Sequence, residues 1–268
     1  MKSKNEIFKN GSKTYHTASL FFPKNVRNDV TRLYAFVRVA DDFVDKIPQD
    51  KKGFYKFKTL SEKAFTCTVD NEVIDDFVLL CKEYDFEKKW VDAFLSAMEQ
   101  DLVKSHYLTY EELEKYMYGS AEVIGLMMAR ILRLSKKAET AAQLQGKAMQ
   151  LINFIRDVKE DIDLNRQYLP QEDLKRFGIT EISSKVDPES FKKLIAFEIK
   201  RYKKMQEIAR RGYSYIPHST RIPVATAASM YEWTAEQILK NPMVVFEKKI
   251  KPSKARILGE YAKQFFIA

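Results

Sequence analysis

Glycine and proline are scarce in this chain of 268 residues, with 8 of each. Folds that depend on many tight turns, phosphate-binding glycine loops or dinucleotide-binding glycine motifs use both residues more freely. Long apolar runs are also missing, since the most apolar long stretch, 121–134, is interrupted by Glu122, Arg130 and Arg133. The sequence therefore predicts a helical protein without a transmembrane span.

Cysteine and histidine are equally sparse. Cys67 and Cys81 have no histidine pair near them, and His16, His106 and His218 are far apart in the sequence. This pattern matches neither a disulfide framework nor a zinc site, and we interpret both cysteines as buried thiols. The N-terminal segment has basic residues but no apolar stretch of the kind that a secretory signal needs, so we expect a cytoplasmic location.

The formal net charge is +9, which favours anionic partners: nucleic acid, anionic lipid or a phosphorylated substrate. The basic residues are spread along the chain, and their short clusters, such as 248–254, are not interleaved with aromatic residues. We interpret these clusters as a solvated surface.

Helical periodicity and capping residues predict a series of helices and almost no strand. The predicted helices cover residues 26–46, 70–84, 86–104, 109–134, 138–164, 188–215, 221–239 and 254–266. No linker, low-complexity tract or internal repeat divides the chain. The prediction is a single all-α domain over residues 1–268.

A first polar stripe lies on the helix that ends near Pro48. Its members are spaced by four, three and four residues: Tyr34, Arg38, Asp41 and Asp45. They share one helical face, and with Asp42 they crowd three carboxylates at a helix C-terminus, where the helix dipole disfavours negative charge. A hard divalent cation such as Mg²⁺ would compensate this charge.

A second polar stripe lies on a later helix with apolar neighbours. Its members are spaced by three, four and four residues: Gln150, Asn153, Asp157 and Asp161. Buried unpaired carboxylates are costly. Arg156 is expected to pair with Glu160 one turn later, which leaves Asp157 and Asp161 for another partner. The two stripes suggest helices that face each other across a cavity with metal ions between them.

Such an arrangement suits the ionisation of an allylic diphosphate, because metal-bound carboxylates neutralise the departing diphosphate beside an apolar cavity. Arg38 and Arg156 add fixed positive charge for the same leaving group. Two-metal phosphodiester hydrolysis also uses aspartates, but those sites usually rest on sheets. It is the weaker interpretation.

Four segments carry a resemblance to a known family. They read RLYAFVRVADDFVD, QLINFIRDVKEDIDLNRQYLP, YMYGSAEVIG at 116–125, and SKTY at 12–15. In these segments the chain resembles the squalene/phytoene synthase family of head-to-head prenyl synthases over nearly its whole length. Glu122 stands where the family usually has glycine, and we expect it to narrow the cavity or add a polar contact.

The resemblance implies an isoprenoid-synthase-like helical bundle around a central cavity. It also implies condensation of two prenyl diphosphates through a cyclopropyl diphosphate. By this resemblance the metal ligands are Asp41, Asp45, Asn153, Asp157 and Asp161. The implied residues around the diphosphates are Ser12, Tyr15, Tyr34, Arg38, Gln150, Arg156, Tyr168 and Tyr231. Tyr118 matches the tyrosine that handles a proton, Mg²⁺ is the implied cofactor with Mn²⁺ as an alternative, and NADPH would serve only a reductive squalene synthase.

The chain length of the substrate is predicted from the first polar stripe. Thr31 continues the face of Tyr34 and Asp41 and would lie about 15 Å from Asp41 along the helix. A large aromatic residue at this depth would stop a longer prenyl tail, whereas the small Thr31 leaves room for it. Ser19 would do the same if its segment also lines the cavity. This favours geranylgeranyl diphosphate as substrate and phytoene as product, with farnesyl diphosphate and dehydrosqualene or squalene as the alternative.

Alternative functional classes account for fewer features of the sequence. Head-to-tail prenyl elongation and terpene cyclisation use similar aspartates, but the RDVKED and RQYLP context argues against them. A non-catalytic, phytoene-synthase-like assembly factor would have lost metal ligands, and a nucleic-acid-binding protein would leave both acidic stripes unexplained. The expected partner is a prenyl diphosphate, with loose peripheral binding to anionic membranes; the oligomeric state stays open.

Overall fold

The computed structural model describes residues 3–267, with the backbone only for Lys13 and Thr14. In this part of the chain there is no β-strand beyond an isolated bridge between His106 and Gln167, so the all-α prediction is confirmed. The α-helices are α1 Lys4–Gly11, α2 Lys13–Ser19, α3 Lys24–Val44, α4 Lys51–Lys63, α5 Glu72–Glu83, α6 Lys88–Gln100, α7 Tyr110–Met117, α8 Val123–Ile131, α9 Glu139–Arg156, α10 Val158–Asp163, α11 Gln171–Arg176, α12 Pro188–Arg211, α13 His218–Lys240 and α14 Lys254–Ile267. A π-helical turn, η1 Tyr118–Glu122, joins α7 to α8, and the 3₁₀ turns are η2 Lys136–Ala138, η3 Gly212–Tyr215 and η4 Pro242–Phe246. Among these helices none combines the length and the apolar character of a bilayer-spanning segment.

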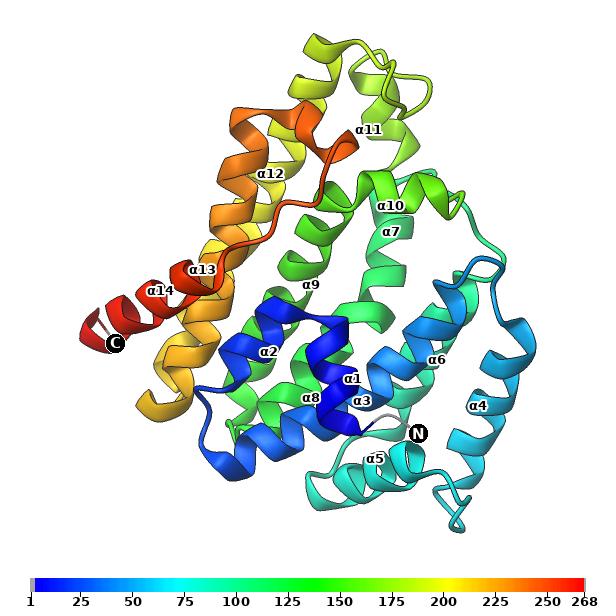
Figure 1. Ribbon diagram of the computed structural model, residues 1–268, viewed down its shortest axis with the longest axis vertical. Helices are drawn as coiled ribbons and strands as arrows, with labels where there is room; N and C mark the ends of the chain where they lie inside the picture. The colour runs from blue at the N-terminus through cyan, green and yellow to red at the C-terminus, as the bar shows by residue number, and fades with distance from the viewer. Residues whose placement is uncertain (1–2, 268) are drawn as a thin grey trace.

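The helices surround α9, which crosses the middle of the molecule (Figure 1). On one side α9 packs against α12 and α13, and on the other side against α8 and η1. The helix α3 packs against α1, α4, α5, α6 and α8. The two helices that carry the predicted polar stripes therefore belong to different layers, with space between them for a site.

Stacked aromatic rings hold α3 against its neighbours. Phe36 is fully buried, and its ring stacks on Phe77 of α5 with centroids 3.7 Å apart. Phe57 of α4 and Phe94 of α6 contact the same ring at 5.1 and 6.0 Å. Burial of such rings contributes about 2 kcal/mol each. Because Phe36 faces this core, the opposite side of α3 is free to line the site.

Some local predictions need correction. Asn71, not Asp70, caps α5, and Asp70 has a positive φ of 54°. Cys67 is exposed, whereas Cys81 is buried as expected. The helix α4 was not predicted, although Asp50 caps it. Most residues of α4 are polar or charged, so its buried Phe54 and Phe57 alone do not form a clear helical pattern of apolar residues in the sequence.

The predicted helix 138–164 is broken at Asp157, which separates α9 from α10. Side chains at neighbouring positions of a continuous helix diverge by about 100°. The break lets Arg156 contact Asp157, its neighbour in sequence, with Nε and Nη2 at 2.7 and 2.6 Å from the two carboxylate oxygens. Glu160, the expected partner of Arg156, pairs with Lys249 instead.

Candidate active site

Two adjoining cavities lie between α3 and α9. The polar cavity has a volume of about 610 Å³, and the apolar cavity has a volume of about 310 Å³. Residues that line both are Tyr15, Tyr34, Val37, Ser120, Gln150 and Asn153. A molecule with a charged head and an apolar tail could therefore place one end in each cavity.

The first stripe forms the α3 wall of the polar cavity. Arg38 lies within 3.0 Å of Asp41 and 2.6 Å of Asp42, so one guanidinium serves two carboxylates. Burial, followed by the charge of Asp45, raises the pKa of Asp41 to about 8 despite Arg38. The wall thus carries more carboxyl groups than Arg38 alone can keep ionised, and a bound cation would favour their charged form.

The second stripe forms the opposite wall. Asn153, Asp157 and Asp161 all line the polar cavity. Burial, followed by the charge of Asp157, raises the pKa of Asp161 well above its usual range. Asp45 of the facing wall shifts the pKa of Asp161 in the same direction, and both carboxylates line the one polar cavity.

Asp101, Tyr116 and Arg166, which were not among the predicted site residues, form a buried network with Tyr168 and Asp45 of the α3 wall. Asp101 at the end of α6 accepts hydrogen bonds from Tyr116 at 2.7 Å and from Tyr168 at 2.9 Å. Arg166 donates to Asp45 at 2.8 Å and to the carbonyl of Val44. The quoted RQYLP segment contained Arg166, but only the fold shows its partner.

Burial raises the pKa of Asp101 to about 6, although Arg166 and the two phenols oppose the shift. Asp101 is only 6% exposed, so its carboxylate is shielded from water and takes its hydrogen bonds from the two tyrosines. It fixes both phenol groups on the cavity wall.

Two lysines of the cluster 248–254 also line the polar cavity, which corrects its interpretation as a solvated surface. Lys249 lies 3.1 Å from Asp157 and also pairs with Glu160. The pKa of Lys251 is lowered by burial and by the charges of Lys249 and Arg156. No local pattern marked these two lysines, because the segment 248–251 forms no helix or strand and its place beside Asp157 depends on the fold.

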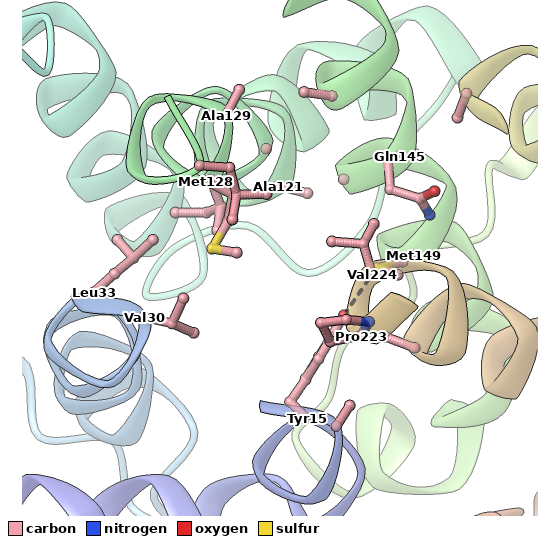
Figure 2. A pocket seen from close by; sticks show the side chains of 18 of the residues that line it. Tyr15, Val30, Leu33, Ala121, Met128, Ala129, Gln145, Met149, Pro223 and Val224 are labelled. Atoms are coloured by element: carbon pink, nitrogen blue, oxygen red, sulfur yellow. Dashed lines mark hydrogen bonds between the residues drawn. The ribbon is translucent and has the colours of Figure 1, made fainter. Parts of the chain in front are cut away.

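The remaining predicted diphosphate residues lie around the same space. Ser12 caps α2 through a hydrogen bond from the amide of Tyr15, and both residues line the polar cavity. Tyr15 donates to the sulfur of Met149, as Figure 2 shows. Tyr231 of α13 lies 5.6 Å from the ring of Tyr15, and Arg156 lies 6.0 Å from the ring of Tyr231.

Tyr118 does not lie where the resemblance implied. It is absent from the walls of both cavities in the part of the chain described, whereas Tyr116 lines the polar cavity. Residues two apart on a helix point about 200° apart, so only one of these tyrosines can face the site. Tyr118 instead is partly buried against the hydrophobic core.

Thr31 also differs from its predicted place. Among the described residues it lines neither cavity, and its hydroxyl donates to the carbonyl of Arg27 at 2.8 Å. The lining side of α3 is rotated from the predicted one and carries Val30, Leu33 and Val37, of which Figure 2 shows the first two facing the apolar cavity. Ser19 does line this cavity.

Glu122 does not narrow either cavity. Its carboxylate lies 3.1 Å from Lys147 of α9, which also pairs with Glu114 at 2.7 Å. Of the two expectations for Glu122, the structure supports the added polar contact, because the ion pair with Lys147 joins η1 to α9.

The donor set fits a hard cation. Among residues 3–267 no three carboxylate, histidine or cysteine side chains gather closely enough to hold a metal by themselves. Mg²⁺ is commonly held by one or two carboxylates together with water and substrate phosphates, so it does not need three. In the same range the Oδ1 of Asn153 is buried without a hydrogen-bond partner, which is costly unless a ligand supplies one.

The all-α fold is that of squalene synthase-like structures. More closely, the chain belongs to the squalene/phytoene synthase family, whose family model matches residues 8–256. It is 28% identical over 258 residues to a 15-cis-phytoene synthase of Synechocystis, which covers 89% of this chain and 76% of that protein. It is also 28% identical over 267 residues to the chloroplastic phytoene synthase of Daucus carota, over 94% of this chain and 67% of that protein.

Solved structures show the same fold. A dehydrosqualene synthase in complex with ligand superimposes with a TM-score of 0.88 at 24% identity, over 98% of this chain and 94% of that one. Squalene synthase HpnC from Alicyclobacillus acidocaldarius gives a TM-score of 0.80 at 22% identity, over 88% and 92%. The chain is a prenyltransferase of the family that joins prenyl groups head to head.

Proposed function

We propose that this enzyme condenses two molecules of geranylgeranyl diphosphate to phytoene through a cyclopropyl diphosphate, with residues 1–268 acting as one domain. The continuity of the two cavities carries the proposal, because Tyr34, Gln150 and Asn153 line both and so stand where diphosphate and prenyl tail would meet. The phytoene synthases among its relatives support this product.

The alternative is farnesyl diphosphate, giving dehydrosqualene, or squalene if NADPH-dependent reduction follows. Ser19 in the apolar wall, together with Ala121, Ala129 and Gly146, favours the longer substrate because small side chains leave the tail room. No glycine-rich dinucleotide motif supports a reductive step, although this alone does not distinguish the products.

The polar cavity would bind the diphosphates and their cation. Asp41, Asp45, Asn153, Asp157 and Asp161 would hold Mg²⁺, with Mn²⁺ as a substitute, and the bound cation would supply positive charge against the departing diphosphate. Arg38 and Arg156 would move from their carboxylate partners toward the same leaving group. Ser12, Tyr15, Tyr34, Gln150, Tyr168 and Tyr231 would complete the surroundings of the diphosphates.

Tyr116 takes over the role that the resemblance implied for Tyr118. When the cyclopropane ring closes, a carbon–hydrogen bond breaks and its electron pair enters the ring. The released proton would go to the phenol oxygen of Tyr116, while the phenol's own proton passes to Asp101. The hydrogen bond to Asp101 already orients the phenol for this transfer.

Mass spectrometry of the hydrocarbon formed from each diphosphate tests the proposal. Purified enzyme receives farnesyl or geranylgeranyl diphosphate with Mg²⁺, with and without NADPH. We expect phytoene from geranylgeranyl diphosphate, no effect of NADPH, and no product after EDTA treatment. A protein that accepts only farnesyl diphosphate would replace this proposal with the alternative, and metal-independent turnover would remove the cation from it.

A further inference from the structure

The last helix, α14, has a second apolar side that faces away from the protein. Its inner side rests on α13 and α2 through the buried Ile257 and the ring of Tyr261, which stacks on Phe21. The outer side repeats small and apolar residues at helical spacing, and we call these residues the α14 outer face: Ala255, Leu258, Ala262, Phe265 and Phe266. Figure 1 shows α14 at the edge of the molecule beside α13.

The side chains of the α14 outer face are strongly exposed. Leu258 and Phe265 are 54% exposed, and Phe266 is 87% exposed. Single exposed apolar residues are ordinary, but a stripe at helical spacing on one helix marks a surface that another apolar phase covers.

Positive charge flanks this stripe. Arg256 and Lys263 lie two turns apart on one flank, Lys254 begins the helix, and Glu260 is its only acidic residue. Lys254 adds to the positive charge around His16, whose pKa is lowered by burial and then by the charges of Lys9, Lys254 and Arg27. An apolar stripe with basic flanks is the pattern of a helix that lies in the surface of an anionic bilayer.

We propose that the α14 outer face docks the enzyme on anionic lipid, with α14 lying parallel to the membrane surface. A second copy of the chain fits less well, because a twofold contact would bring the same basic flanks together.

The short turn at residues 20–22 connects the α14 outer face to the apolar cavity. Leu20 is 48% exposed, Phe21 stacks on α14 with ring centroids 3.7 Å apart, and Phe22 lines the apolar cavity.

Docking on a bilayer would serve product release only if the proposed function holds, because a hydrocarbon product that leaves the apolar cavity would enter the bilayer rather than water. The binding itself is measured without substrate. Flotation with phosphatidylglycerol vesicles, compared with phosphatidylcholine vesicles, should show binding to the anionic lipid that weakens in high salt. The double variant Phe265→Ser/Phe266→Ser should lower that binding by at least about tenfold.

Val103→Ser is the matched control, because Val103 is 78% exposed between α6 and α7 and lies outside the α14 outer face. It should bind as the unaltered protein does. The variant Lys254→Gln/Lys263→Gln should retain weak binding but lose most of its salt dependence. Thermal melts of all variants check that α14 stays folded.

Absence of vesicle binding in the unaltered protein, or equal binding by the double phenylalanine variant, would overturn the proposal. So would a concentration-dependent dimer that the same double variant abolishes, because the face would then belong to a second copy. Hydrocarbon formation from detergent-dispersed substrate is assayed separately and should be unchanged in the double variant. Failure of that assay in the unaltered protein would count against the proposed function and leave the vesicle result standing.

Discussion

The polar and the apolar cavity share part of their walls, and the two amide side chains Gln145 and Asn153 on these walls differ in whether their oxygen has a hydrogen-bond partner. In the apolar cavity Gln145 accepts hydrogen bonds from Tyr213 at 2.7 Å and from Gln206 at 3.0 Å, so its amide oxygen is satisfied within the protein. Where the two cavities meet, the Oδ1 of Asn153 is buried and has no partner among the described residues. Polar groups with internal partners hold the wall in shape, whereas groups left without them are available to a ligand.

The largest effect is expected where a carboxylate is removed from the polar cavity. Asp157→Asn takes a charge from the wall that would hold the cation, and we expect turnover to fall by roughly 10²–10³-fold or more. The variant also leaves Arg156 without its anionic partner at 2.6 Å, so some stability is lost.

Steady-state rates over a Mg²⁺ titration, together with a thermal melt, check both expectations. If near-normal turnover persisted in this variant, the two stripes would not be a metal site.

Variants of Tyr116 and Tyr118 test which of the two tyrosines handles the proton, since the structure favours Tyr116 and the sequence resemblance implied Tyr118. Tyr116→Phe removes the phenol that Asp101 orients, and the turnover should fall by about 10²-fold. Tyr118→Phe should change turnover little, because Tyr118 lines neither cavity in the described part of the chain. Asp101→Asn should resemble Tyr116→Phe. A stronger loss for Tyr118→Phe than for Tyr116→Phe would reverse the assignment.

Close helix packing shapes the apolar side, so Gly125→Ala should destabilise the protein by about 1–3 kcal/mol. A Cβ at Gly125 would lie 2.1 Å from the carbonyl oxygen of Ala142 on α9, and backbone must move to admit it. Gly259→Ala on α14 is the control, since nothing lies within 4 Å of its added Cβ, and it should stabilise by about 0.5–1 kcal/mol. Denaturant melts compare the two, and equal effects would contradict the close approach of α8 and α9.

The smallest effect is expected on substrate choice. Ser19→Phe places a ring in the apolar wall and should lower the use of geranylgeranyl diphosphate relative to farnesyl diphosphate by about tenfold. Leu20→Phe, at an exposed neighbouring position, should leave the ratio unchanged. Competition assays with both diphosphates measure it. An unchanged ratio in Ser19→Phe would place the limit on tail length elsewhere.

Much of the site follows from local sequence periodicity, because residues one turn apart share a helical face in any fold. This is why the spacing alone groups Arg38, Asp41 and Asp45, and why the all-α class follows from scarce glycine and proline. Periodicity does not fix the rotation of α3 about its axis, which packing of Phe36 against α5 decides. Thr31 was therefore placed on the cavity wall although Val30 and Leu33 occupy it.

Contacts between segments that are far apart in the chain could not be predicted from local sequence patterns. Asp101 meets Tyr168 and Arg166 meets Asp45 only because α6, α3 and the segment after α10 are folded onto one another, and such pairings have no local signature. The break at Asp157 likewise depends on its surroundings, with Lys249 arriving from far along the chain to share that carboxylate. The sequence by itself indicated the all-α class, most of the longer helices and the side chains available to a site. Tertiary packing decided which side chains face the cavities, because burial and pairing of charge are properties of neighbours in space.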